Sequence, residues 1–559
     1  MTTLHRYVLR DLLKTFGLAV VAMTALFTLA GGVYNVISQE GVGAAELFYL
    51  LPLLIPVIVT FTMPLAALFA ATSTYGRLAA DNELTACRAA GINIHRLLAS
   101  AVLLSVFVAL FSVIFINVVI PGMLGQINNF VRSNLRGIAE QRLKTQGAIV
   151  FTDPHGRFGI RGQLLLTAQG VRGDFDAERL RARGWDPSLG YLEIVRPTFL
   201  QLDENGEIER FTTAELGWCQ FDTSKNPLEV TVIVTQAREF TLDRRITHVA
   251  QQTIGPIPLD YELRAKPSLL DMNSLIRLYH LPWEARDIAK GLRDLRYRLL
   301  LALVHEHIAE QVAADRPFLL PQRDGRTLRI QAAAASEDRG RITLRDVRVE
   351  LDEPDPARPS RYTAPQAILV MEPERDDQIP ATLRLIGRPD APVRADHPGS
   401  THFRRAREKD IEVLDNGLLP AELPAAVADI PDPHLLDRTV PLPVADAAAE
   451  AARDKLVKAA AHLQRVIISL FHFRFGFAAS ALVTVVMGAA LGIIFRGGRA
   501  LAAFGLSTIP FALAALLIVM GRQTAVKPGT ALLGGLIIWG GLTALAIADA
   551  IIVRLGVRR

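Results

Sequence analysis

Six apolar runs, each long enough to cross a bilayer, constrain this chain more than any other feature. They occupy residues 16–37, 47–71, 97–120, 475–495, 501–520 and 531–553. Because about 20 helical residues cross roughly 30 Å of hydrocarbon, each run predicts a membrane helix. Three runs lie at each end of the chain. The expected fold class is an α-helical membrane protein with six transmembrane helices (3+3) around an inserted domain.

The inserted domain is polar by contrast. Between Pro121 and Arg465 no comparable apolar run occurs. Half of the residues are hydrophobic and the mean hydropathy is +0.27, which is too apolar for an ordinary soluble protein and too polar for a fully embedded one. The first apolar run is long and is followed at once by another, so we do not expect a cleaved signal peptide.

The basic residues of the short connections predict the orientation in the membrane. One side carries Arg6, Arg10, Lys14, Arg77, Arg88, Arg96, Arg496, Arg499, Arg554, Arg558 and Arg559. On the opposite side, the connection at residues 38–46 carries no basic residue. The other connection on that side carries Arg522 and Lys527, which are an exception to the pattern. Lys and Arg favour cytoplasmic connections, so both termini should be cytoplasmic and the central region should lie on the far side. The same bias explains the net charge of +5 without a nucleic-acid partner.

The central region shows short alternating strands. We expect strands at residues 158–160, 163–167, 192–202, 208–213 and 228–234, with a turn at 203–206 and an edge or bulge at Pro197, which together indicate an all-β sandwich or jellyroll-like roll. Residues 343–353, 362–364 and 381–386 echo residues 192–204, 211–214 and 228–234. Duplication of a β unit is one explanation, and the general likeness of any two β segments is the other.

These patterns divide the chain into six parts. Membrane helices one to three fill residues 1–121, and a β-jellyroll-like domain fills 122–268. A helical connector follows at 269–320, where Pro282 interrupts the helical pattern. A second β unit is expected at 321–417. Residues 418–469 should be a linker, rich in Pro and Asp up to 443, and a helix leading to the membrane; residues 470–559 hold membrane helices four to six.

Catalytic and metal-binding patterns are missing from the sequence. No GxxxxGK[ST] segment is present, so no P-loop is expected, and no GxSxG segment is present either. His305 and His307 flank Glu306, but a helical zinc motif needs two histidines four residues apart, so they are expected to be solvated helix residues. Cys87 and Cys219 fall on opposite sides of the membrane and cannot pair. We therefore predict no catalytic residue, no metal site and no cofactor in this chain, with any energy supplied by another protein.

One polar stretch between two apolar runs predicts a short rigid helix. Asp81 can cap a helix over residues 82–90, and Gly91 can end it in the left-handed conformation. Arg77, Asp81, Leu84 and Arg88 then share one face. A plain cytoplasmic loop is the alternative.

At these residues the sequence resembles a known family. The segments Met63-Pro64-Leu65, Tyr75-Gly76-Arg77-Leu78, Asn82-Glu83-Leu84-Thr85 and Arg88-Ala89-Ala90-Gly91, followed by Asn117 and Pro121, are similar to those of the lipopolysaccharide-export permeases of the LptF/LptG type. The resemblance covers roughly the first 280 residues and the last 90. In the last part, Phe473-Arg474 and the Gly488-x-x-x-Gly492 spacing, which allows close helix packing, are similar as well.

The resemblance implies a transport function in the bacterial inner membrane. It implies a cytoplasmic ABC ATPase dimer that holds ATP and magnesium, a paralogous permease or a second copy of this chain, and a periplasmic jellyroll bridge protein. Lipopolysaccharide or a related lipid is the implied substrate. Glu83 is the implied docking acid, within an ATPase-coupling set of Arg77, Asp81, Asn82, Glu83, Leu84, Arg88 and Gly91. The lipid path is expected at Leu192, Ile194, Phe199 and Leu202.

The chain departs from the family pattern by about 170 extra residues between positions 283 and 454. These residues leave the lipid's identity open and keep a rival function in view, namely a membrane-tethered periplasmic lipid-binding or scaffold protein without an ATPase partner. A hydrolase is a third alternative and the weakest, because no catalytic constellation is found.

Overall fold

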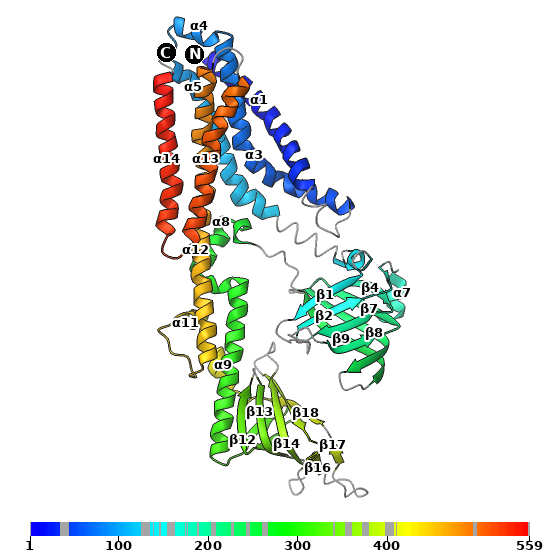
Figure 1. Cartoon of the computed structure of the whole chain (residues 1–559). Coiled ribbons are helices and arrows are strands. Elements are labelled where there is room, and N and C mark those ends of the chain that lie inside the picture. The colour runs from blue at the N-terminus through cyan, green and yellow to red at the C-terminus, as the bar shows by residue number, and fades with distance from the viewer. Residues whose placement is uncertain are drawn as a thin grey trace. The chain divides into compact units, whose positions relative to one another are not determined.

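The computed structural model divides the chain into two compact units (Figure 1). The first unit contains Met1–Arg277 and Gln464–Arg559, and the second contains Leu278–Leu463. The structure describes residues 2–33, 44–123, 135–137, 139–144, 147–153, 162–173, 175, 177–186, 189–202, 208–224, 228–241, 246–259, 266–338, 341–352, 360–371, 379–388, 390–396, 407–409, 411–495 and 500–556.

Six helices within these ranges are long and apolar enough to cross a membrane. The N-terminal three are α1 (Thr2–Phe27) with the π-helical turn η1 (Thr28–Val33), α3 (Ala44–Ala80), and α5 (Ile94–Ile114) with the π-helical turn η2 (Phe115–Val119). The C-terminal three are α12 (Ala447–Ile494), α13 (Ala500–Val526) and α14 (Ala531–Gly556). The predicted arrangement of three plus three membrane helices is confirmed.

Three of these helices extend well beyond the apolar runs that predicted them. Helix α1 already begins at Thr2, α3 continues to Ala80, and α12 begins at Ala447 and includes the helix expected to lead into the membrane. An apolar run marks only the part suited to hydrocarbon, whereas a helix ends where its backbone hydrogen bonds end. Helix boundaries were therefore underestimated even where the helices themselves were predicted.

Small residues bring α12 into direct contact with α3. A Cβ atom added to Gly492 would lie 2.6 Å from the main-chain oxygen of Thr72 and 3.1 Å from the amide nitrogen of Gly76. One added to Gly488 would lie 2.6 Å from the Leu68 side chain. Such small residues let membrane helices approach until their backbones touch. The close packing predicted from this glycine pair is confirmed, and it joins the two halves of the bundle.

Both ends of the chain lie at one end of the bundle. The start of α1, the end of α14 and the short helix α4 (Glu83–Ala89) lie together there (Figure 1). Leu4, Leu84 and Val553 contact the same buried cluster, which also includes residues of α3, α5 and α12. The described start of α1 and the described end of α14 therefore pack against the same cluster as α4.

The first β-sheet is antiparallel and has nine strands. They are β1 (Ala148–Asp153), β2 (Gly162–Thr167), β3 (Gly170–Arg172), β4 (Gly190–Val195), β5 (Thr198–Leu202), β6 (Ile208–Thr213), β7 (Leu216–Asp222), β8 (Leu228–Thr241) and β9 (Ile246–Leu259). The order is β1-β2-β5-β6-β8-β7-β4-β3, and β9 pairs with β8. A short helix, α7 (Ala177–Ala182), lies between β3 and β4 in the sequence.

Residues 192–202 form parts of two strands instead of one. Strand β4 pairs with β3 and β7, whereas β5 pairs with β2 and β6. The chain turns at Arg196, which has a positive φ of 49°, and Pro197 follows. Pro197 was expected to mark an irregularity, but the change of neighbours could not be read from local alternation. Strands β1, β3, β7 and β9 were also missed. The expected strand at 158–160 and the turn at 203–206 lie outside the described residues.

The second unit holds another antiparallel sheet. Its strands are β10 (Phe318–Pro321), β11 (Thr327–Gln331), β12 (Ala334–Asp338), β13 (Arg341–Leu351), β14 (Ser360–Met371), β15 (Pro380–Ile386), β16 (Val393–Asp396), β17 (Arg407–Lys409) and β18 (Ile411–Leu418). The main order is β10-β11-β13-β14-β15-β18. A single bridge between Gln322 and Gly417 joins the two ends of this order. The sheet is therefore nearly closed into a barrel.

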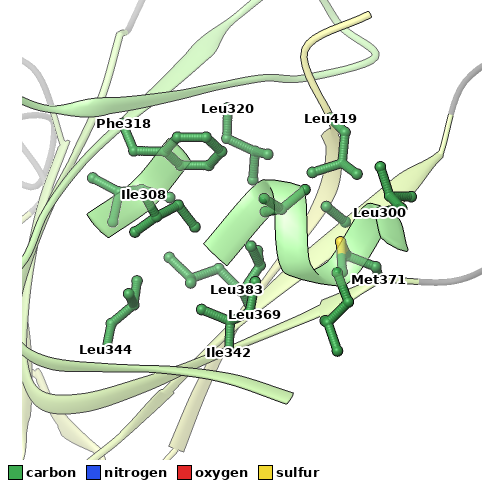
Figure 2. Close-up of a cluster of buried hydrophobic side chains, with 14 of the residues drawn as sticks. Leu300, Ile308, Phe318, Leu320, Ile342, Leu344, Leu369, Met371, Leu383 and Leu419 are labelled. Carbon is green, nitrogen blue, oxygen red and sulfur yellow. The ribbon is translucent and has the colours of Figure 1, made fainter. Parts of the chain in front are cut away.

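A long helix fills the apolar side of this second sheet. Helix α9 (Arg286–Ala313) places Leu300 and Ile308 among Phe318, Leu320, Ile342, Leu344, Leu369 and Leu383 (Figure 2). All of these side chains are at most 3% exposed. Their burial explains the apolar stripe of the helix, which packs against strand residues that alternate at period two.

The segment before this sheet is mostly helical. It contains η3 (Pro267–Leu269), α8 (Met272–His280), η4 (Pro282–Glu284) and α9, so Pro282 does interrupt the helical pattern.

The linker predicted at 418–443 is instead part of the second unit's core. It forms α10 (Glu422–Ala428) and α11 (Asp432–Leu436), with Val427 and Leu435 buried. Arg296 of α9 donates to the main-chain oxygen of Ile430, at 2.8 Å. Arg453 of α12 donates to those of His434 and Leu435, at 3.1 and 3.2 Å. The Pro and Asp residues of this segment lie in and beside short helices. The same composition is typical of loops, which is why a linker was expected.

The two sheets agree with the predicted duplication only in part. Strands β5, β6 and β8 are neighbours in that order, as are β13, β14 and β15. However, the segment 192–204 covers two strands from different parts of the first sheet, whereas its counterpart lies in the single strand β13. The predicted correspondence fails there, because likeness between strand sequences does not specify which strands pair.

We expect Gly492→Ala to destabilise the bundle. The added methyl group would meet backbone atoms of α3 that cannot move aside, so α12 and α3 must separate and lose contacts. Thermal unfolding in detergent should show a lower midpoint. The control is Gly505→Ala in α13, where a Cβ has nothing within 4 Å and helix propensity improves by roughly 1 kcal/mol. Equal midpoints for the two variants would contradict the assigned packing.

Candidate functional site

The short helix α4 is entered through a tight reversal of the chain. Asp81 directly follows the last residue of α3, and its amide donates to the main-chain oxygen of Arg77 at 2.9 Å. The reversal falls on Asn82, with φ 58°, and α4 begins at Glu83. The predicted cap at Asp81 is wrong, because Asn82 is the residue that precedes α4. Asn82 precedes the helix without a side-chain cap, and asparagine is among the residues that tolerate the left-handed region.

The end of α4 matches the prediction. Gly91 has φ +75°, its amide donates to the main-chain oxygen of Arg88, and the amide of Ile92 donates to that of Cys87, both at 2.9 Å. These two bonds form a Schellman motif, which satisfies the last carbonyls of the helix. Helix α4 therefore has a defined end in spite of its seven residues.

The predicted coupling residues do not share one face. Leu84 is 5% exposed and packs into the bundle, with Cys87 beside the same cluster. Arg77 lies on α3, and its guanidinium pairs with Asp11 of α1. Glu83 and Arg88 are half-buried, and Asp81 and Asn82 are exposed. The alignment was inferred from one continuous helix, but the reversal at Asn82 separates α3 from α4.

The exposed face of α4 consists of small residues. Thr85, Ala86, Ala89 and Ala90 are all exposed, on the side away from Leu84. A partner could therefore approach the backbone of α4 closely along this face, with Glu83 at its N-terminal end. Sequence reasoning missed these alanines because the resemblance emphasised charged residues.

Three of the four residues expected on the lipid path line the interior of the first sheet. Leu192 and Ile194 on β4 are fully buried, and Phe199 on β5 is 2% exposed. They share an apolar cluster with Leu166, Val230, Val232 and Val234. The side chain of Leu202 lies outside the described residues. The sheet thus gathers apolar side chains from separate strands into one interior.

An arginine that the sequence reading noted only as part of the family resemblance lies in a buried site. Arg474 of α12 is 1% exposed and donates to Asn117 Oδ1 at 2.8 Å, and to the main-chain oxygens of Ser268 and Leu270 at 3.1 and 2.6 Å. Asn117 lies in the π-helical turn η2, a feature often found at functional sites. An ionisable residue in a membrane helix is itself a signal of function. The signal was missed here because Arg474 immediately precedes the apolar run that begins at residue 475.

No group of three or more metal-binding side chains occurs in the part of the chain that the structure describes. His305 and His307 are half-buried, and the ring of His307 lies 6.0 Å from that of Phe318. His307 therefore packs against the second sheet, and neither histidine is the fully solvated residue that was expected.

The two cysteines should differ strongly in reactivity. Burial raises the pKa of the Cys219 thiol to about 12, while Cys87 is partly exposed. A folded pKa above the unfolded value of about 8.5 means that this group's contribution to stability is present below pH 8.5 and is lost as the pH rises towards 12. At pH 8 we expect maleimide to label Cys87 and to leave Cys219 unmodified until denaturant is added. Mass spectrometry of Cys87→Ser and Cys219→Ser variants checks this, and labelling of native Cys219 would contradict it.

Comparison with known proteins supports a transport function for the N-terminal part of the chain, which contains α4 and the first sheet. Residues 6–259 match the family model of the lipopolysaccharide export system permease LptF/LptG. No curated protein matches the chain. The match covers α1, α3, α4, α5 and the first sheet and ends at β9, so the resemblance noted in the last 90 residues stays a prediction. The chain is a multi-pass membrane protein, and over residues 6–259 its resemblance to the LptF/LptG family of lipopolysaccharide export permeases is confirmed.

Proposed function

We propose that the chain is the non-catalytic permease subunit of an ABC-type exporter. A cytoplasmic ATPase dimer, which holds the ATP and magnesium, binds α4 and supplies the energy. The chain extracts lipopolysaccharide or a related amphipathic lipid from the inner membrane and passes it through the first β-sheet to a periplasmic jellyroll bridge. Both termini are cytoplasmic, and the large central region is periplasmic.

The observation that carries the proposal is the two-sided character of α4. Its inner side, through Leu84, packs into a cluster that includes Leu12 of α1, Leu78 of α3, Leu97 of α5 and Val485 of α12. Its outer side exposes Thr85 and small alanines, with the half-buried Glu83 at the N-terminal end. A force applied to the outer side would thus reach four membrane helices through close-packed contacts, and close-packed interiors transmit displacement well.

The helix surface supports the lipid and permease partners of the proposal. Large apolar side chains are exposed on α1, α5 and α13, among them Leu18, Val21, Leu110, Ile509 and Leu516. A membrane helix needs no polar surface where it meets lipid or another helix. A paralogous permease, or a second copy of this chain, would pair through part of this surface and leave the rest to the lipid substrate.

Charge reversal and steric blocking at α4 test the ATPase contact. We expect Glu83→Lys to weaken co-purification of the ATPase in detergent by about tenfold or more, since a charge-assisted contact becomes repulsive. Ala86→Trp should weaken it similarly by filling the face that the partner must approach. Quantified pull-down and ATP hydrolysis by the reconstituted complex provide the measurements.

The matched control is Ala425→Trp, which places the same side chain on the exposed face of α10 in the second unit. It should leave ATPase binding unchanged. Normal binding and turnover with both Glu83→Lys and Ala86→Trp would rule out docking at α4.

The two sheets should differ in contact with the lipid. Photo-crosslinking residues at Leu192 and Phe199 should capture lipid in an ATP-dependent way. The same residues at Leu344 and Leu369 should not, because α9 already fills that interior (Figure 2). Deletion of residues 332–415 should accordingly leave capture at Leu192 intact. Capture at Leu344 would place the second sheet on the lipid path.

A further inference from the structure

The buried guanidinium of Arg474 links three separate segments of the first unit. Asn117 belongs to the third membrane helix, Arg474 to the fourth, and Ser268 and Leu270 to the segment around η3. A charged group that is removed from water is stable only when hydrogen bonds and charges compensate it. Here three acceptors surround the guanidinium, and Asp271 acts on it electrostatically.

Each partner is held in place by its own contacts. The side-chain nitrogen Nδ2 of Asn117 donates to the main-chain oxygen of Val113 at 2.8 Å. This bond leaves the side-chain oxygen Oδ1 of Asn117 to accept from Arg474. Asp271 caps α8 by accepting from the amides of Asn273 and Ser274 at 3.2 and 3.4 Å. The hydrogen bond with the Ser274 side chain is the main cause that lowers the pKa of Asp271, so its carboxylate is charged at neutral pH. The site is therefore preorganised.

The segment that Arg474 binds, residues 268–270, follows the last strand of the first sheet in the sequence. Strand β9 ends at Leu259, and η3 begins at Pro267. Eight residue steps span at most about 28 Å, at roughly 3.5 Å for each step. Strand β9 pairs with β8, which supplies Val230, Val232 and Val234 to the apolar interior. Residues 268–270 are therefore joined by a short stretch of chain to the strand pair that borders the expected lipid path.

We propose that Arg474 is a positioning residue for lipid transfer, because it fastens residues 268–270 to α5 and α12 and so passes the movement of these helices to the first β-sheet. The inference rests on the proposed function. Arginine suits this role because its planar guanidinium has five donors that can bind several fixed oxygens at once, whereas the lysine ammonium is a point charge.

The test compares variants in the full complex with its ATPase, reconstituted into vesicles that contain lipopolysaccharide. Arg474→Gln should keep ATP hydrolysis within about twofold and lower lipid capture at Phe199 by about tenfold or more, since bonds to a charged group are lost. Arg474→Lys should restore part of the capture. Arg465→Gln is the matched control, because Arg465 of the same helix also donates to a main-chain oxygen, that of Val526, at 3.0 Å, but ties α12 to α13 instead.

Two further measurements separate positioning from folding. Amide hydrogen exchange over residues 267–275 should rise by about tenfold or more in Arg474→Gln and stay unchanged in Arg465→Gln. A short thiol crosslink between Asn117→Cys and Leu270→Cys in the Arg474→Gln background, with Cys87 and Cys219 changed to serine, should recover lipid capture. Recovery is not expected if Arg474→Gln merely unfolds the bundle.

The outcomes are distinguishable. A wild-type complex that leaves the lipid in the membrane would overturn the proposed function itself. The positioning role alone is overturned if wild type transfers lipid and Arg474→Gln transfers it equally well, or if the crosslink restores nothing.

Discussion

The close contact between α12 and α3 is the constraint on which the rest of the first unit depends. Gly488 and Gly492 allow α12 to approach until the position of a Cβ on Gly492 lies 2.6 Å from a backbone oxygen of α3. The helices before and after the central region are more than 300 residues apart in sequence. Because lipid tails are as apolar as the side chains, close packing has to hold such helices together. Without this close packing, α4 and Arg474 would not be held by the same set of helices.

Arginine side chains help to hold short helical segments in place in both units. Arg296 and Arg453 bind main-chain oxygens of the segment between β18 and α12, and Arg474 binds those of residues 268 and 270. In each case a guanidinium donates to main-chain carbonyls in or beside short helices. The same type of contact occurs in the polar second unit and beside the membrane helices, where an unsatisfied charge costs more free energy.

The two sheets differ in what occupies their apolar side. Within the described residues, the first presents Leu192, Ile194 and Phe199 in an interior built mainly from strands, whereas the second is filled by α9 (Figure 2). In the proposed function the lipid meets the strand-lined interior of the first sheet, whereas a helix already occupies the interior of the second.

The sequence by itself determined the six membrane helices, the insertion of β structure, the glycine contact and the end of α4 at Gly91, because hydrophobic runs, strand alternation and left-handed glycines are local signals. The family resemblance over residues 6–259 also rested on short local motifs. Only the tertiary structure decided that Leu84 faces the bundle, that residues 192–202 divide between two strands and that residues 418–443 are packed. It alone brought Arg474 to Asn117 and to residues 268–270. Those features depend on which distant segments meet, and no spacing within a single segment encodes that.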